Sequence, residues 1–266
     1  LEPKMQKKKS LKTIRNLLSL FCVVISPLNF LFASEIFLYS MDSEKTVKGM
    51  NLKEKQIRHS PCSTFKIPNT VFGLEHGFIK NKSFKLKYDS KKNPPKNWWP
   101  AVWSKDHSLD TAIKNSVVWY YQEVARQIGK KTMQSFIEQS NYGNKDLTSP
   151  IDQFWLGASL RISPEEQIQF LKKLFANEFN FSPKNINILK EILVWKKLNK
   201  QTIYAKTGSC DQGNGLKGAW LVGFVESSTN KNTYFAYYTE HKDFQTASEK
   251  RNKQSLNYLK KYKLIP

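Results

Sequence analysis

Ser63 and Lys66 stand three positions apart at the start of a stretch that predicts a helix, so their side chains share one helical face. At that spacing an amine can reach a serine hydroxyl and remove its proton, which is the activation that a nucleophilic serine needs. The same spacing occurs at Ser228 and Lys231, in a segment that reads as a surface turn. The pair alone therefore fits a solvated helix start as well as a catalytic site.

Three further elements follow this pair along the chain. Residues 116–118 (Ser-Val-Val) open a helix and offer the hydroxyl of Ser116 on a turn. Residues 142–144 (Tyr-Gly-Asn) form a turn, and residues 206–208 (Lys-Thr-Gly) end an edge strand. Penicillin-recognising serine enzymes carry such a set of a serine–lysine pair, a serine-containing loop and a Lys-Thr-Gly strand.

Five segments make the likeness specific, because together they resemble class D β-lactamases, the oxacillinase type. These are residues 61–69 (PCSTFKIPN), 116–129 (SVVWYYQEVARQIG), 142–144 (YGN), 154–167 (FWLGASLRISPEEQ) and 205–209 (AKTGS). Class A enzymes would show Ser-Asp-Asn in the second motif and a glutamate base in a later loop. The resemblance implies a β-lactam hydrolase that works through a covalent acyl-serine.

The resemblance also implies roles for individual residues. Ser63 is expected to attack the lactam carbonyl while backbone N–H groups of Ser63 and Ser209 hold the oxyanion. Lys66, desolvated in an apolar pocket, is expected to react with carbon dioxide and to act as general base in the carbamate form (N6-carboxylysine). Trp155 would donate its indole N–H to that anion, although core packing explains this tryptophan as well.

The remaining candidates surround the nucleophile. Ser116 is expected to relay a proton to the departing nitrogen with electrostatic help from Lys206, and Arg251 to bind the substrate carboxylate, with a solvated arginine as the alternative. The catalytic candidates are Ser63, Lys66, Ser116, Trp155 and Lys206; the substrate-binding candidates are Val118, Thr207, Gly208, Ser209, Arg251 and Trp103. A catalytic and a turn-forming interpretation of Tyr142 and Asn144 both stay open.

Cys62 directly precedes Ser63, and Cys210 directly follows Ser209. If the two backbone N–H groups share one oxyanion, the cysteine Cα atoms can fall within roughly 4.4 to 6.8 Å, the range of a disulfide. A similarly placed bridge is a feature of class A carbapenemases. We therefore predict a disulfide between Cys62 and Cys210, with two reduced buried thiols as the alternative.

The elements that position these residues follow from apolar spacing and turn residues. The predicted strands are residues 35–41, 202–208, 219–225 and 233–239. The predicted helices are residues 64–76, two helices within 110–140 that are separated near Gly129, a helix that begins at Ser163 with a capping box, and a helix from about 247 to 262. A proline-broken loop at 80–104 carries Trp103. This order predicts an α+β protein with the penicillin-recognising serine hydrolase fold, in which an antiparallel sheet is flanked by helices and residues 78–190 form a helical lobe.

The first 34 residues predict export. Basic residues precede the apolar stretch 17–32, and the small residues Ala33 and Ser34 follow it, as in a signal peptide. Polar residues interrupt the stretch, which disfavours the alternative of a membrane anchor. Residues 1–4, before Met5, are interpreted as a cloning remnant. We expect a catalytic domain at 35–266, secreted into the periplasm of a Gram-negative bacterium.

The formal net charge of +21 would fit a nucleic-acid-binding protein if it were concentrated. The lysines are instead scattered, without an arginine-rich helix or an RNA-binding aromatic signature, so we expect no nucleic-acid partner. Small β-lactams are the expected partners. We expect no metal and no cofactor other than carbon dioxide or bicarbonate, and the oligomeric state stays open.

Two other functions share much of the motif set. A penicillin-binding transpeptidase or carboxypeptidase would also acylate its serine, and a β-lactam sensor domain would stay acylated in order to signal. Two departures from the class D pattern matter for the fold. The first strand begins close to the predicted cleavage position, without the extra helix of many relatives, and residues 157–159 (Gly-Ala-Ser) replace an acidic or glycine-rich sequence.

Overall fold

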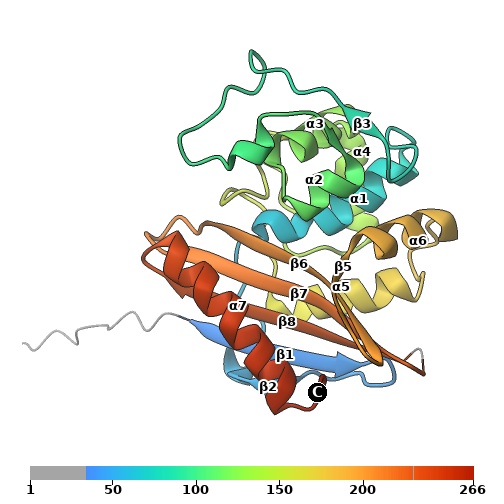
Figure 1. The fold of residues 1–266 in the computed structure, drawn as a ribbon, viewed down its shortest axis with the longest axis vertical. Coiled ribbons are helices and arrows are strands. Elements are labelled where there is room, and N and C mark those ends of the chain that lie inside the picture. Colours follow the sequence, from blue (N-terminus) through green and yellow to red (C-terminus); the bar gives the residue numbers. More distant parts are fainter. Residues whose placement is uncertain (1–33, 230) are drawn as a thin grey trace, which may run out of the picture. The chain divides into compact units, whose positions relative to one another are not determined.

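The computed structural model describes residues 34–229 and 231–266, and its central element is a six-stranded antiparallel sheet (Figure 1). The strands lie in the order β2-β1-β8-β7-β6-β5. Their bounds are β1 Glu35–Met41, β2 Lys48–Met50, β5 Val194–Leu198, β6 Gln201–Asp211, β7 Lys217–Ser227 and β8 Asn232–His241. The predicted signal peptide lies outside the described residues except for Ser34, whose carbonyl accepts a hydrogen bond from Glu240 N–H at 3.0 Å.

Strand β7 is buried on both faces because its side chains alternate between two apolar clusters. Trp220, Val222 and Phe224 point into the larger cluster, which also contains the helices of the site. Leu221 and Val225 point into a smaller cluster on the opposite face. A near-continuous apolar run such as 219–225 is what a central strand needs when both of its faces are covered.

Helices cover the two faces of the sheet. The terminal helix α7 (Phe244–Lys261) lies across the front of the sheet in Figure 1, and its Leu259 packs with Phe37 and Phe235. Helix α5 (Pro164–Phe175) lies on the other face. Its predicted capping box is present, because Ser163 Oγ accepts from the N–H of Glu166 at 3.2 Å while the carboxylate of Glu166 accepts from Ser163 N–H at 2.9 Å.

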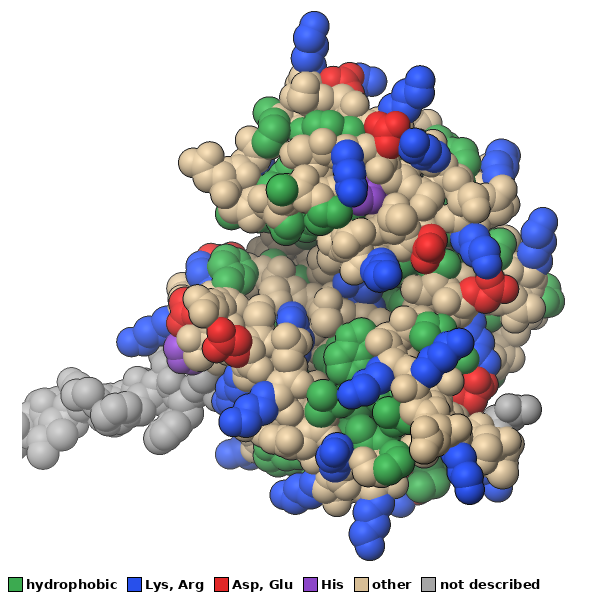
Figure 2. All heavy atoms as spheres, in the orientation of Figure 1, with side chains coloured by type: hydrophobic (Ala, Val, Ile, Leu, Met, Phe, Trp, Pro, Cys, Tyr) green, Lys and Arg blue, Asp and Glu red, His purple; other side chains and the backbone are tan. Residues whose placement is uncertain are grey.

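The remaining helices form the upper part of the molecule in Figure 1. They are α1 Lys66–Glu75, α2 Leu109–Lys114, α3 Val118–Ile128, α4 Lys130–Gln139 and α6 Pro183–Ile192. The 3-10 turns η2 Cys62–Phe65 and η3 Ala101–Trp103 and the two-stranded ribbon of β3 Lys85–Leu86 and β4 His107–Ser108 accompany them, whereas the 3-10 turn η1 Leu52–Glu54 lies beside β1. Figure 2 shows a hollow between this part and the sheet, and lysine and arginine side chains spread over the visible face.

The fold class is as predicted, an antiparallel sheet flanked by helices, but details differ. The segment 110–140 contains parts of three helices and not two, because Ser116 takes a left-handed backbone (φ 55°) and separates α2 from α3. Sequence patterns also missed β5 and α6. Among the described residues, no helix is both long and apolar enough to cross a bilayer.

Candidate active site

The nucleophile candidate lies at the junction of η2 and α1. Lys66 Nζ is 2.7 Å from Ser63 Oγ, and Lys66 is completely buried. Burial lowers the pKa of the Lys66 amine well below its usual range, and the nearby charge of Lys206 adds to this effect. The ring of Tyr121 also lies close to this amine, with its centre 5.4 Å away. A largely neutral amine within hydrogen-bond distance of a serine can act as a base or as a nucleophile toward carbon dioxide.

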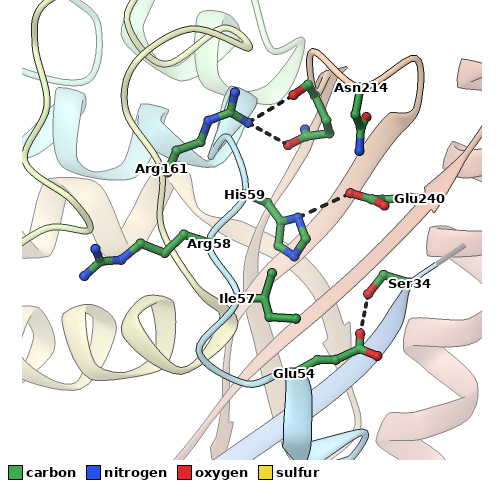
Figure 3. A pocket seen from close by; sticks show the side chains of 9 residues that line it. Ser34, Glu54, Ile57, Arg58, His59, Arg161, Asn214 and Glu240 are labelled. Atoms are coloured by element: carbon green, nitrogen blue, oxygen red, sulfur yellow. Dashed lines mark hydrogen bonds and ion pairs between the residues drawn. The ribbon is translucent and has the colours of Figure 1, made fainter. Parts of the chain in front are cut away.

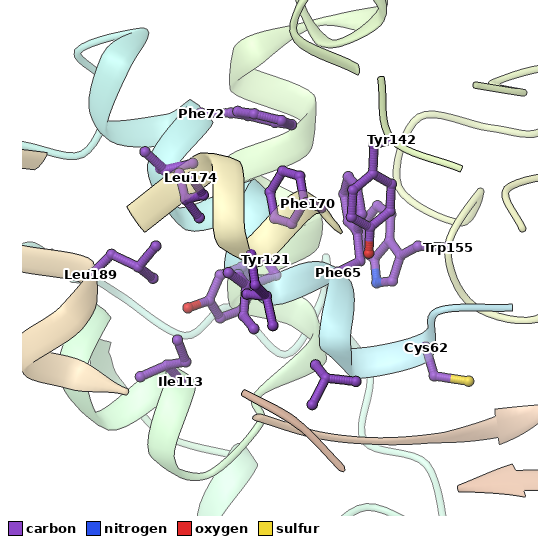
Figure 4. Packing of buried hydrophobic residues seen from close by; sticks show 14 of the residues in the cluster. Cys62, Phe65, Phe72, Ile113, Tyr121, Tyr142, Trp155, Phe170, Leu174 and Leu189 are labelled. Carbon is purple, nitrogen blue, oxygen red and sulfur yellow. The ribbon is translucent and has the colours of Figure 1, made fainter. Parts of the chain in front are cut away.

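An aromatic cluster surrounds the segment that carries Lys66 (Figure 4). The ring of Phe65 stacks on Trp155 at 5.4 Å between centroids and meets Phe154 and Tyr142 edge-on at 5.0 and 5.7 Å. The indole Nε1 of Trp155 is buried and has no hydrogen-bond partner among the described residues. A buried donor without a partner is uncommon and points to an acceptor supplied from elsewhere.

A second hydroxyl–amine pair faces the first. Lys206 Nζ, on β6, lies 3.1 Å from Ser116 Oγ and 2.9 Å from the carbonyl of Thr207. The left-handed backbone of Ser116 makes the sharp turn that brings its hydroxyl to the strand. Burial lowers the pKa of Lys206 to about 7, and the positive charge of Arg251 contributes to the decrease. Lys206 can therefore change its charge close to neutral pH.

Strand β6 passes very close to the nucleophile turn at Gly208. A Cβ atom at this position would lie 3.0 Å from the carbonyl oxygen of Pro61 and from a side-chain methyl of Thr64, so glycine allows the close approach. One residue further along, Ser209 Oγ accepts a hydrogen bond at 2.9 Å from the guanidinium of Arg251 on α7. Burial lowers the pKa of Arg251 to about 10, which leaves it cationic at neutral pH.

The predicted disulfide between Cys62 and Cys210 is present, with the two Cα atoms 5.5 Å apart. It joins the residue before Ser63 to the residue after Ser209, across 148 positions of sequence. Cys62 has a left-handed backbone (φ 52°). The bond thus ties the nucleophile turn to the strand edge.

The other candidates occupy different places. Val118 begins α3 and is half-buried beside the site. The indole N–H of Trp103 donates to the carbonyl of Asn115 at 2.8 Å. Tyr142 is buried behind Phe65, away from the surface. The side chain of Asn144 donates to a loop carbonyl at 2.9 Å and accepts from the loop N–H of Arg161 at 2.9 Å. The turn-forming interpretation describes these last two residues best.

Sequence reasoning missed a polar group behind the nucleophile turn. His59 Nδ1 and the Glu240 carboxylate lie 3.3 Å apart on one side of a pocket of about 480 Å³. The guanidinium of Arg161 donates to the backbone carbonyl of Gln212 at 3.2 Å. Figure 3 shows Arg161 above the His59–Glu240 pair, while Arg58 turns away from the pocket. No local sequence pattern predicts that His59 and Glu240 form a pair, because the two residues come from segments distant in sequence.

The comparisons with known proteins agree with this geometry. Residues 37–259 match the family model of the penicillin binding protein transpeptidase domain, so the fold and the site define a penicillin-recognising serine protein. The chain is 38% identical over 196 residues to the β-lactamase OXA-19 of Pseudomonas aeruginosa, which covers 73% of this chain and 72% of the relative. The chain therefore belongs to the class D β-lactamases and is a β-lactam hydrolase.

Solved structures and one receptor extend the comparison. The structure resembles FUS-1 (OXA-85), a class D β-lactamase from Fusobacterium nucleatum, with a TM-score of 0.80 and 32% identity over 88% of this chain and 94% of the other. The sequence of this chain is also 34% identical over 203 residues to the regulatory protein BlaR1 of Bacillus licheniformis, and the match covers 76% of this chain and 32% of that protein. The regulatory protein BlaR1 thus contains a segment similar to these hydrolases.

Proposed function

We propose that this protein opens β-lactam rings through an acyl ester on Ser63, with Lys66 in its carboxylated form as general base. The observation that carries the proposal is the 2.7 Å contact between Ser63 Oγ and the amine of a completely buried lysine. Burial lowers the pKa of this amine well below its usual range and so favours the neutral form, which is the form that adds carbon dioxide.

The surroundings of Lys66 suit a carbamate. The buried indole N–H of Trp155 has no partner among the described residues, and an indole can only donate, so an anion is its natural acceptor. Trp155 stacks on Phe65, the residue adjacent to Lys66. When present on Lys66, the carbamate supplies an oxygen base in an apolar pocket.

Each residue of the site has a separate step in the proposed reaction. Ser63 Oγ gives its proton to the Lys66 base and attacks the lactam carbonyl carbon. The C–N bond breaks as the ring nitrogen takes a proton from Ser116, Lys206 at 3.1 Å replaces that proton, and the proton held by the base returns to Lys206. Water then attacks the Ser63 ester and gives a proton to the base, which passes it to Ser63 Oγ as the ester C–O bond breaks and the acid leaves.

Substrate binding rests on β6 and α7. We assign the backbone N–H groups of Ser63 and Ser209 to the developing oxyanion, and the Cys62–Cys210 bond next to both supports their closeness. Arg251 carries a buried charge with no carboxylate partner among the described residues, which suits the carboxylate of a penicillin. Thr207 and Gly208 present the strand edge, and Val118 lines the opposite side.

Export to the periplasm is part of the same proposal. The basic and apolar pattern of residues 1–34 supports a signal peptide. The disulfide supports an oxidising compartment, since cytosolic thiols are normally kept reduced. Hydrolysis there would destroy the antibiotic before it reaches its targets and would confer resistance.

The test is penicillin turnover, followed by absorbance with and without added bicarbonate, together with the intact mass of the protein. We expect rapid multiple turnover that bicarbonate strengthens, and loss of turnover in Lys66→Ala. ¹³C-bicarbonate should give a carbamate NMR signal that is absent in this variant. A single burst that leaves a persistent adduct on Ser63 would instead assign the chain a receptor function like that of BlaR1.

A further inference from the structure

Ser60 lies three residues before the nucleophile and is completely buried. Its hydroxyl donates to the carbonyl of Trp155 at 3.0 Å and accepts from the N–H of Gly157 at 2.9 Å. One side chain therefore bridges the backbone on both sides of Leu156. These two bonds connect the nucleophile segment to a loop about a hundred residues later in the chain.

The backbone of Ser60 is held just as firmly. Its N–H donates to the side chain of Gln212 at 2.9 Å, and its carbonyl accepts from the indole of Trp220 at 2.9 Å. The preceding residue, His59, forms an antiparallel bridge with Ile162 through two further hydrogen bonds of 2.8 and 3.0 Å. Ser60 is thus anchored to the sheet and can in turn hold the loop in place.

The loop at residues 155–157 depends on the hydrogen bonds from Ser60, because the indole of Trp155 has no hydrogen bond of its own among the described residues. Its ring direction depends on stacking against Phe65 and Phe154 and on the backbone at Trp155. Gly157, which has no side chain of its own, has a left-handed backbone (φ 83°). Loss of the Ser60 hydroxyl would leave the buried carbonyl of Trp155 and the partly buried N–H of Gly157 without this partner and free the loop to shift.

We propose that Ser60 is a positioning residue that fixes the Trp155 loop against the nucleophile segment and thereby sets how readily Lys66 takes up carbon dioxide. The proposal rests on the proposed function, because it assigns the Trp155 indole to the carbamate. Ser60 itself does not touch substrate. Its effect reaches the reaction through the position of one indole N–H.

Ser60→Ala tests this assignment. We expect the bicarbonate concentration for half-maximal penicillin turnover to rise about tenfold, as the loss of a buried hydrogen-bonded pair would cause, and saturating bicarbonate to restore most of the turnover. The acyl adduct on Ser63 should accumulate when bicarbonate is limiting. A merely structural role would lower the melting temperature without changing the bicarbonate demand, and that result would overturn the proposal.

Two matched comparisons sharpen the test. Ser60→Thr keeps the hydroxyl, whereas Ser60→Val has the same shape as threonine and lacks the hydroxyl. Only the valine variant should therefore need more bicarbonate for half-maximal turnover. An equal bicarbonate requirement in both variants would contradict the proposal. Ser255→Ala removes a hydroxyl from another completely buried serine, on α7, and should leave the demand unchanged. If the parent protein turns over penicillin without any response to bicarbonate, the proposed function itself fails, before any variant is compared.

Discussion

Lys206 Nζ lies 3.1 Å from Ser116 Oγ, so a strand of the sheet and a turn of the helical lobe meet through one amine and one hydroxyl. The amine is buried, and its pKa is about 7. Below this pH Lys206 is an ammonium ion that can support proton delivery through Ser116. Above it the lysine is neutral, so kcat/KM should decline as pH rises through the neutral range.

Arg251→Ala should move that decline to higher pH. The positive charge of Arg251 contributes to the low pKa of Lys206, so its removal raises the pKa and keeps the ammonium form to higher pH. The pH profile of kcat/KM measures this shift, which is separate from the weaker substrate binding expected of the variant. Lys253→Ala, an exposed change on the same helix, should leave the profile in place; a profile unmoved in both variants would exclude the coupling.

Trp155→Phe should increase the bicarbonate demand about tenfold or more while it keeps an aromatic ring against Phe65. The reason is that the variant removes the buried indole N–H, together with the five-membered part of the ring. Trp103→Phe is the control, because it deletes an indole N–H that already bonds to Asn115. A bicarbonate titration of both variants checks the prediction, and equal demands would show that the Trp155 N–H has no special role.

Loss of the disulfide should destabilise the protein. The double variant Cys62→Ala/Cys210→Ala is expected to lose about 2 to 4 kcal/mol of unfolding free energy, because the bond closes a long loop in the unfolded chain. Urea unfolding of oxidised and reduced parent protein should show the same difference. Reductant should leave the double variant unaffected; a parent protein equally stable in both redox states would refute the prediction.

Gly157→Ala should be more damaging than Gly215→Ala, although both glycines have a similar left-handed backbone (φ 83° and 81°). The backbone term alone costs about 1 to 2 kcal/mol. At Gly157 a Cβ would also lie 2.5 Å from the carbonyl oxygen of Asp211, whereas nothing lies within 4 Å at Gly215. Thermal unfolding of the two variants separates the clash from the backbone effect, and equal losses would mean that the loop adjusts freely.

Local sequence rules predicted much of the scaffold. The strand at 35–41 matches the observed bounds of β1, and the capping box at Ser163 is formed. The spacing of Ser63 and Lys66 placed two groups in contact because one turn of helix fixes their separation. The Cys62–Cys210 bond was predictable because each cysteine adjoins a residue expected at the same oxyanion.

Other parts of the site depend on contacts that no local pattern encodes. Ser60 resembles any serine before a proline, and its four hydrogen bonds come from segments that only the folded chain brings together. The edge strand β5 is only five residues long and has two lysines among Val-Trp-Lys-Lys-Leu, so its pairing with β6 is not evident from the local pattern. The left-handed backbone of Ser116 likewise follows from the turn between two packed helices.

The Cys62–Cys210 bond gives the enzyme a dependence on its host. A gene for this protein that entered a new bacterium would bring the cysteines, but not the cellular machinery that oxidises them. In a recipient with weak oxidative folding, the same sequence would yield a less stable enzyme and a lower level of resistance. We therefore expect the resistance that this gene confers to vary between bacteria with their capacity to form disulfides.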